Sequence, residues 1–181
     1  MKNALNKTYK GFTIIEVMIV LAIAGLIMVI VFFAIPQLQR NQRDNARQSM
    51  TTRLKAEIET YSSNNQGLYP FGGVGPAVTD CILANATLQS CYDWYNRYVS
   101  GGKVKITDPS TGNDALLFYT NTATRQTPAP WQGGNVYIHV GYKCQGDTIV
   151  AAGGSTGPNA KQYAVVTTLD RSNTYFCVDN G

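Results

Sequence analysis

The feature that most limits how this chain can fold is an uninterrupted apolar run near its N-terminus. From Val17 to Ile35 there are 19 consecutive uncharged, almost wholly apolar residues. As an α-helix with a rise of about 1.5 Å per residue, this run would measure about 28 Å. That length is close to the roughly 30 Å hydrocarbon core of a bilayer, so the run predicts one membrane-spanning helix.

The segment that precedes the run, residues 1–11, is short, polar and basic. It holds Lys2, Lys7 and Lys10 and no acidic residue. Because basic residues beside a spanning helix stay in the cytoplasm, we expect the rest of the chain to face outward. Beyond this segment, 12 basic and 11 acidic residues nearly balance. Such a balance gives no electrostatic basis for a nucleic-acid site.

One acidic residue, Glu16, stands at the start of the apolar stretch. A carboxylate in lipid costs at least about 2.5 kcal/mol on insertion scales, and such residues usually serve a function with a partner. The run contains no basic residue, but a cut between Gly11 and Phe12 would create an α-amine on Phe12 of the same or a neighbouring chain. An ordinary secretory signal or a simple anchor explains neither the acid nor the Gly-Phe junction.

We expect the helix to continue beyond Pro36. Apolar residues recur there at helical spacing, at Ala46, Met50, Leu54, Ile58 and Tyr61. Charged residues between them predict a solvated face, formed by Arg43, Arg47, Arg53, Lys55, Glu57 and Glu59. The pattern predicts one helix from about Phe12 to Ser62, which Pro36 kinks and does not end. The sequence NNQG and Pro70 then stop it.

The remainder reads as a loop region followed by a sheet. Residues 67–114 are expected to form a connecting loop region. It contains one short helix, from Ser90 to Val99, of which Ser90 is the N-cap. Five later runs are rich in β-branched or aromatic residues and predict strands: 115–121, 135–143, 147–152, 162–169 and 174–180. Their short gaps favour an antiparallel sheet packed on the amphipathic half of the helix. The expected fold class is therefore α+β.

The four cysteines are Cys81, Cys91, Cys144 and Cys177. None forms a C-x-x-C pair and the chain has one histidine, His139, so a zinc site is not expected. An even number in an exported chain predicts two disulfides. Three pairings are open, and we favour Cys81–Cys91 with Cys144–Cys177 because each pair brackets one segment. His139 lies in an alternating run and is expected at the surface.

The N-terminal residues resemble a known signal. K-G-F-T-I-I-E-V at Lys10 to Val17, followed by an apolar helix, resembles the prepilin signal of the type IV pilin family. The wider superfamily includes type II secretion pseudopilins and competence pilins. The resemblance implies a cut between Gly11 and Phe12, N-methylation of Phe12, and pairing of Glu16 with a neighbour's N-terminus during assembly. Many members carry a kink proline where this chain has Phe33.

The resemblance also implies the type IV pilin fold and its organisation. A leader covers residues 1–11, and the membrane-spanning assembly helix covers 12–36. The amphipathic half of the helix covers 37–62, and the globular head covers 63–181, with its loop region at 67–114 and its sheet at 115–181.

The function so implied is structural and non-enzymatic. A prepilin peptidase and N-methyltransferase would process the chain, which would wait in the cytoplasmic membrane with its head outside. An assembly platform and an ATPase would polymerise it into a surface filament for motility, adhesion or DNA uptake. The alternative is a pseudopilin or minor pilin of a type II secretion or competence system.

A rival of another class is a membrane-tethered enzyme or binding domain. It would have only His139 as a histidine base and a set of ungrouped aspartates: Asp80, Asp93, Asp108, Asp114, Asp147, Asp170 and Asp179. The motifs of hydrolases, zinc proteases and P-loop enzymes are missing from the sequence.

No cofactor is expected, with calcium as the one weak candidate. Residues 107–114 offer spaced oxygen ligands, chiefly Asp108 and Asp114. The loop lacks the spacing and final glutamate of an EF-hand, and Asp-Pro and Thr-Gly-Asn are ordinary turn sequences. Some pseudopilins bind calcium in a head loop, which is what keeps this candidate open.

Overall fold

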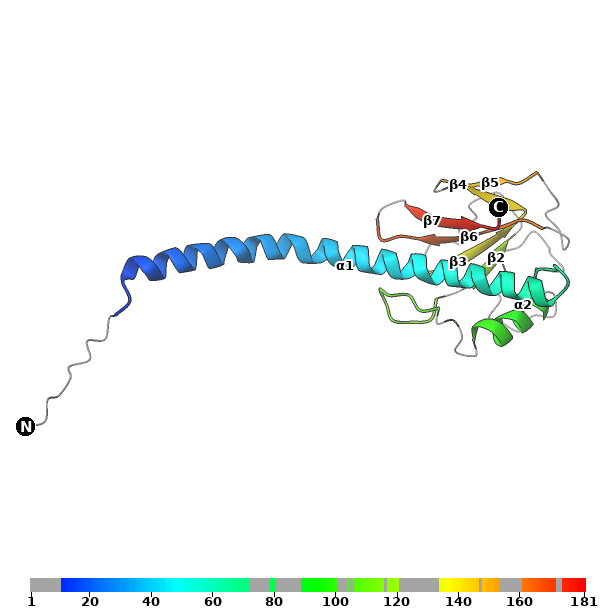
Figure 1. The fold of residues 1–181 in the computed structure, drawn as a ribbon, viewed down its shortest axis with the longest axis horizontal. Coiled ribbons are helices and arrows are strands. Elements are labelled where there is room, and N and C mark those ends of the chain that lie inside the picture. Colours follow the sequence, from blue (N-terminus) through cyan, green and yellow to red (C-terminus); the bar gives the residue numbers. More distant parts are fainter. Residues whose placement is uncertain are drawn as a thin grey trace, which may run out of the picture. The chain divides into compact units, whose positions relative to one another are not determined.

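The computed structural model describes residues 11–71, 79–80, 89–100, 104, 106–115, 117–120, 134–146, 148–153, 161–171 and 174–181. The chain divides into two compact units, Met1–Gln39 and Arg40–Gly181. Helix α1 runs from Ile14 to Asn64 and contributes to both units (Figure 1). The long helix predicted for about Phe12 to Ser62 is therefore confirmed, with both ends shifted by two residues.

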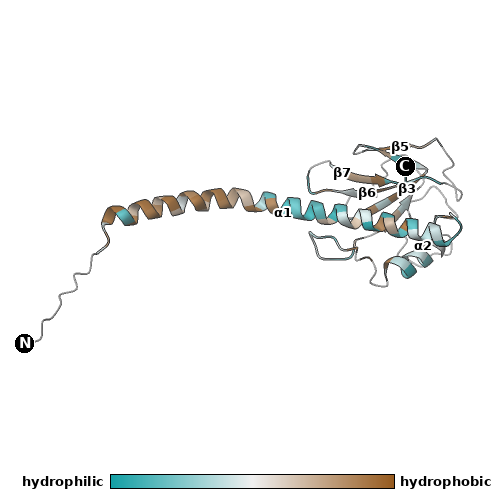
Figure 2. Cartoon of the chain, in the orientation of Figure 1, coloured by the Kyte–Doolittle hydropathy of each residue, from teal (hydrophilic) through white to brown (hydrophobic). Residues whose placement is uncertain are grey.

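Pro36 lies inside α1 and does not end it, as predicted. A proline removes one backbone hydrogen bond, which a long helix can lose while the flanking turns persist. The hydropathy of α1 changes along its length, from apolar in its N-terminal half to mostly polar in its second half (Figure 2). Within the first unit, every described side chain is exposed.

The C-terminus of α1 has a capped end. Gln66 and Gly67 adopt positive φ angles of 57° and 80°. The Gly67 N–H donates to the Ser62 carbonyl at 2.9 Å, which satisfies one of the last free carbonyls of the helix. The predicted stop at NNQG is therefore confirmed.

The head contains a five-stranded sheet in the order β1-β2-β3-β6-β7 and a separate hairpin, β4-β5. The strands of the sheet are β1 (Thr79–Asp80), β2 (Leu117–Thr120), β3 (Val136–Val140), β6 (Tyr163–Thr168) and β7 (Tyr175–Asp179). The hairpin consists of β4 (Tyr142–Gln145) and β5 (Thr148–Ala151). The run predicted as one strand at 135–143 is divided by Gly141, whose φ of 80° turns the chain out of the sheet.

The strands pair mostly as predicted. The pairs β1–β2, β3–β6, β6–β7 and β4–β5 are antiparallel, so the α+β class with an antiparallel-rich sheet is confirmed. The pair β2–β3 is parallel, which differs from the expectation. The 15 residues between Thr120 and Val136 account for the difference. Such a stretch is long enough for the crossover that parallel neighbours need.

The second half of α1 packs on one face of the sheet. Met50, Leu54 and Ile58 meet the alternate residues Val136 and Ile138 of β3 in one core cluster. The cluster also takes in Phe71, Tyr119 and Tyr163, with Tyr69 packed against it. Of the predicted apolar stripe, Ala46 is exposed and Tyr61 is half-buried.

Two short helices close the core near the end of α1. These are α2 (Gln89–Trp94) and the π-helix η2 (Tyr95–Val99). The Trp94 side chain is fully buried, and its Nε1–H donates to the Glu57 carbonyl at 3.4 Å. The short helix predicted at Ser90–Val99 is present, but α2 already begins at Gln89, so Ser90 is not its N-cap.

His139 is buried, at 2% exposure, so its predicted surface position is wrong. The reason is that β3 is a central strand with both faces covered. On the face opposite the α1 cluster, Tyr137 stacks on Phe118 with ring centroids 5.2 Å apart, and His139 packs edge-to-face with Tyr142 at 6.1 Å. The hairpin strand β4 also lies against β6 and β7.

Arg47 is only 1% exposed, so the prediction that it belongs to a solvated face of α1 is wrong. Its guanidinium donates to Asp108 at 2.9 Å, to Ser110 at 2.6 Å and to Asp170 at 2.5 Å. A buried charge is tolerated when it is paired and hydrogen-bonded in this way. Neighbouring ion pairs between side chains extend this group into a charged cluster, which consists of Arg43, Asp44, Arg47, Asp108, Asp170 and Arg171.

A second polar contact joins α1 to the sheet. The buried Tyr163 hydroxyl donates to Glu59 at 2.6 Å. Burial and the nearby Glu59 carboxylate raise the pKa of Tyr163 well above its usual range, so this hydroxyl stays protonated and remains a donor. Another predicted solvated residue, Glu59, is thus half-buried and bonded.

Candidate functional site

The Gly-Phe junction lies immediately before α1. Gly11, Phe12 and Thr13 are not helical, and the Phe12 side chain is 90% exposed. A Cβ built on Gly11 would meet no atom within 4 Å. The fold of this chain therefore places no demand for glycine at residue 11. A strict need for glycine there would come from a protein that binds the junction.

Thr13 and Glu16 form a capping box at the start of α1. Glu16 Oε2 accepts hydrogen bonds from the Thr13 backbone N–H and hydroxyl, both at 2.9 Å. In return, Thr13 Oγ1 accepts the Glu16 backbone N–H at 3.3 Å. These reciprocal bonds satisfy free donors of the first turn, where the helix dipole also favours a negative charge.

Thr13 is the residue of this site that the sequence interpretation missed. The signal was present, because Thr followed three residues later by Glu is the usual pattern of a capping box. The box gives Glu16 a local partner in the uncut chain, and it holds the carboxylate at the end of the helix. A cut before Phe12 would create an amine one residue from Thr13. The structure therefore brings Glu16 to the N-terminal turn but does not test its predicted pairing.

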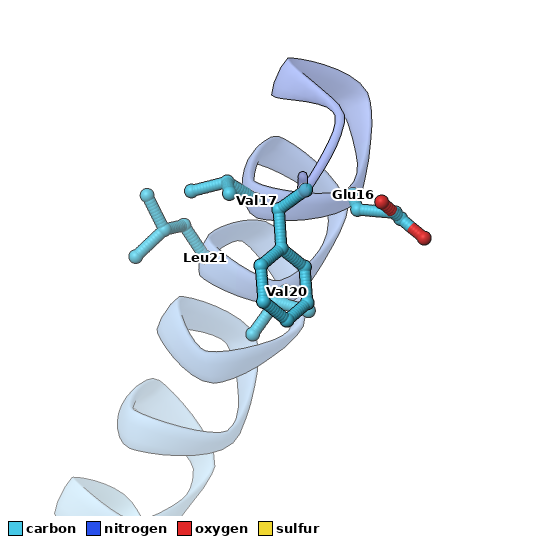
Figure 3. A pocket seen from close by; sticks show the side chains of 5 residues that line it. Glu16, Val17, Val20 and Leu21 are labelled. Atoms are coloured by element: carbon cyan, nitrogen blue, oxygen red, sulfur yellow. The ribbon is translucent and has the colours of Figure 1, made fainter. Parts of the chain in front are cut away.

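A shallow hollow runs along the first two turns of α1. Its lining residues are Phe12, Glu16, Val17, Val20 and Leu21. In Figure 3 the Glu16 carboxylate points to the side of the helix opposite to Val17 and Leu21. The hollow is apolar apart from this one acid, and it suits an apolar side chain of another helix.

The rest of the first unit presents apolar side chains without cover. Ile14 is 82% exposed and Phe33 is 79% exposed, and the other large apolar residues between them are also exposed. A continuous apolar surface of this size requires lipid or other helices around it. By length and composition α1 can cross a membrane, and no part of its most apolar stretch is buried against the rest of the described chain.

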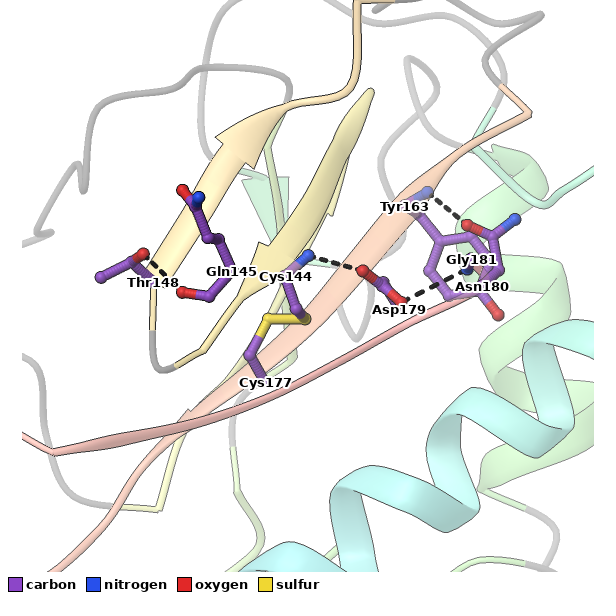
Figure 4. The surroundings of a disulfide bond; sticks show 8 residues. All are labelled: Cys144, Gln145, Thr148, Tyr163, Cys177, Asp179, Asn180 and Gly181. Atoms are coloured by element: carbon purple, nitrogen blue, oxygen red, sulfur yellow. Dashed lines mark hydrogen bonds between the residues drawn. A yellow bond between two sulfur atoms is a disulfide. The ribbon is translucent and has the colours of Figure 1, made fainter.

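The head contains the disulfide Cys144–Cys177, one of the two pairs that the sequence favoured. It joins β4 of the hairpin to β7 of the main sheet, with Cα atoms 5.8 Å apart (Figure 4). Cys91 is buried. Its predicted partner, Cys81, lies outside the described residues, so that pair stays a prediction.

The calcium candidates are in different surroundings. The Asp108 carboxylate is buried and accepts hydrogen bonds from Arg47, Ser110 and Thr111. Asp114 is exposed and pairs with Thr107 in an isolated bridge. The described parts of the chain hold no group of three or more His, Cys, Asp or Glu residues suited to a metal ion. Calcium binding thus stays a prediction, one that would compete with Arg47 for Asp108.

Comparison with known proteins bears on the N-terminal segment. Residues 6–32 match the family model described as the prokaryotic N-terminal methylation motif. The match includes Gly11, Phe12, Thr13 and Glu16 together with most of the apolar run. No curated protein and no solved structure matches this chain.

Proposed function

We propose that this chain, a type IV pilin-like protein by the prepilin signature at residues 6–32, is a structural subunit of a type IV pilus. The signature points to a structural protein. The observation that carries the proposal is one local arrangement: an exposed Gly-Phe junction, then a capped helix start with Glu16, then an exposed apolar helix.

The first step in this proposal is removal of the leader. A prepilin peptidase cuts between Gly11 and Phe12 and methylates the new amine. The exposure of Phe12 and the non-helical backbone on both sides of the bond support access by a peptidase. The open space around Gly11 supports a glycine requirement that belongs to the peptidase.

The second step is residence in the cytoplasmic membrane. The motif and the long apolar helix fit a membrane-anchored protein. The basic residues 2, 7 and 10 favour an orientation with the leader in the cytoplasm and the head outside. In that position the exposed apolar side chains of α1 contact lipid.

The third step is polymerisation through α1, driven by an assembly platform and ATPase. Helices in lipid gain little hydrophobic energy from association, so a directional polar contact has a large influence on where they meet. Thr13 holds the Glu16 carboxylate at the N-terminal turn. There the carboxylate would accept a hydrogen bond from the protonated Phe12 amine of a neighbouring subunit. The apolar helices then form the fibre core, and the heads cover it.

The same N-terminal features suit a pseudopilin or minor pilin of a secretion or competence system. Abundance in surface filaments distinguishes these roles from that of the main subunit. We would shear and purify filaments from the cells that express this chain and quantify their proteins by mass spectrometry. A major pilin should be the dominant protein and should begin at Phe12. A trace amount would favour the minor or pseudopilin role, and absence from filaments and membranes would contradict the proposal.

A further inference from the structure

The β4–β5 hairpin forms a sheet of its own, so its attachment to the main sheet needs separate contacts. Two contacts converge on one residue of β4. The Cys144 sulfur is bonded to Cys177 of β7, and the Cys144 backbone N–H donates to Asp179 Oδ2 at 2.6 Å. Figure 4 shows both contacts side by side between the hairpin and β7.

Cys177 and Asp179 are placed by β7 without help from the hairpin. They are two residues apart on one strand, so their side chains lie on the same face. The strand is set by its antiparallel pairing with β6, where Val166 faces Cys177 and Ala164 faces Asp179. The main sheet can therefore present a cysteine and a carboxylate together to the hairpin.

The end of the chain keeps the Asp179 region in place. Asp179 Oδ1 accepts the Gly181 N–H at 3.3 Å. The side chain of the next residue, Asn180, makes two hydrogen bonds. Its Oδ1 accepts from the Tyr163 N–H at 3.0 Å, and its Nδ2 donates to the Lys161 carbonyl at 2.6 Å. These bonds tie the C-terminal residues to the start of β6, so the Asp179 carboxylate has a defined position.

We propose that Asp179 is a positioning residue for the Cys144–Cys177 disulfide. When the two cysteines are reduced, the Asp179 carboxylate accepts a hydrogen bond from the Cys144 backbone N–H. This bond holds the Cys144 thiol beside the thiol of Cys177. A hydrogen bond to an ionised acceptor is about twice as strong as a neutral one, which suits a contact at a half-buried site. This inference rests on the head alone and is independent of the proposed function.

The bond itself forms by thiol–disulfide exchange with an external disulfide. One cysteine thiolate attacks that disulfide and releases one thiol, and the second thiolate then displaces the other half. In total the two cysteines lose two protons and two electrons, and the oxidant is reduced to two thiols. Asp179 takes no electron or proton in this scheme. It raises the concentration of one thiol near the other, and so makes the disulfide harder to reduce.

The test measures the redox equilibrium of the full chain in detergent micelles. Protein is equilibrated with mixtures of glutathione and glutathione disulfide and quenched by alkylation. Peptide mass spectrometry then gives the oxidised fraction of Cys144 and Cys177. We expect Asp179→Ala to lower the equilibrium constant for the disulfide about tenfold, near the lower end of the cost of losing a hydrogen bond to a charged group. Asp179→Asn, which keeps an acceptor oxygen without the charge, should fall between.

A matched control comes from the hairpin turn. Thr148 Oγ1 donates to the Gln145 carbonyl at 2.8 Å within the hairpin itself. Thr148→Ala removes that bond without touching β7, so the redox equilibrium should not move. An unchanged equilibrium in Asp179→Asn would overturn the proposal, even if Asp179→Ala did not fold. A shift in Thr148→Ala as large as that in Asp179→Asn would also overturn it, because any loosening of the hairpin would then suffice.

Discussion

Glu16 has one role that the structure shows and a second that we propose. It completes a capping box with Thr13, and it is the acid proposed to meet the amine of a neighbouring Phe12. The two roles are compatible because the cap holds the carboxylate at the end of the helix where the proposed cut would create the amine. A residue-level test can separate them, since glutamine can serve in a capping box but carries no charge.

Gly11→Val should leave an uncut precursor. A branched side chain would crowd a peptidase site shaped for glycine, whereas the chain itself has open space there. Mass spectrometry of the protein from cells should find the wild type beginning at Phe12 and the variant at Met1. A wild-type N-terminus at Met1, or one near Gly25, would show that the junction is not the processing site.

Glu16→Ala should be processed and inserted but should form few or no fibres. Removal of the carboxylate eliminates its cost of insertion, so membrane residence should be as good or better. Glu16→Gln keeps the cap without the charge, so its fibre number should lie between those of the wild type and Glu16→Ala. Membrane fractionation and electron microscopy of sheared filaments measure both effects. Normal fibre numbers in Glu16→Ala would remove this residue from the assembly mechanism.

Gly134→Ala should destabilise the head by about 3 kcal/mol, the size typical of breaking a buried ion pair. A Cβ at residue 134 would lie 2.3 Å from Asp108 Cγ, so the carboxylate would have to leave Arg47. The φ of +96° adds strain. Thermal unfolding followed by circular dichroism gives the comparison. Gly112→Ala has a φ of +74° but no neighbour within 4 Å, and should cost about 1 kcal/mol. Equal losses would mean that strain alone matters.

At the scale of elements, the charged cluster connects α1 to two distant parts of the head. Arg47 binds Asp108 of the loop before β2 and Asp170 after β6. The Asp170 backbone N–H also donates to Asp44 at 2.7 Å. A slide of α1 by one turn toward its N-terminus would put Thr51 in the place of Arg47 and leave Asp108 buried without its cation. We infer that these charges specify where the helix sits on the sheet, a use for which buried ions are best attested.

Acid should weaken this connection. Burial raises the pKa of Asp170, but hydrogen bonds and charge from Arg43 and Arg47 outweigh it and hold the pKa below its usual range. A carboxyl with a depressed folded pKa adds stability above its unfolded pKa of about 3.9, and loses it as pH falls through the folded value. Head stability should therefore decline below about pH 4.

Denaturant unfolding between pH 7 and pH 2.5 would measure this decline. Asp170→Asn cannot titrate, so it should be less stable at neutral pH and should lose less stability in acid. Asp114→Asn, a change at an exposed carboxyl, provides the control and should follow the wild type. An Asp170→Asn curve parallel to that of the wild type would show that another group causes the loss.

At the scale of the whole molecule, the two units differ in what they need from their surroundings. The unit from Arg40 to Gly181 contains the entire described core, including Met50, Leu54 and Ile58 of α1. The unit before it has no buried side chain among its described residues. The described core thus lies wholly in one unit, whereas the exposed apolar surface of the other needs lipid or other helices around it.

A chain that begins at Arg40 should therefore be a soluble, folded monomer. It keeps every described core contact and the Cys144–Cys177 bond, and the described residues that it loses are all exposed. Size-exclusion chromatography, thermal unfolding and non-reducing peptide mapping would check it. Aggregation, or linkage of Cys81 or Cys91 to either C-terminal cysteine, would contradict this description.

The sequence by itself determined the features that depend on neighbours along the chain. The extent of α1, its passage through Pro36, its stop at NNQG and the Gly-Phe-Thr-x-x-Glu signal all follow from local spacing and turn residues. The capping role of Thr13 could have been read in the same way. These contacts span only three to five residues, so a short stretch of sequence contains all of the information.

Tertiary structure decided the features that join distant residues. Arg47 and Asp108 are 61 positions apart, and Cys144 and Asp179 are 35 apart. A charge at a helical surface position reads as solvated unless the carboxylates that neutralise it are known. His139 likewise reads as exposed until the second face of β3 is covered. The parallel pairing of β2 with β3 also depends on where the chain crosses over. Burial is a property of the assembled layers, and so it appears only once the sheet, helix and hairpin are in place.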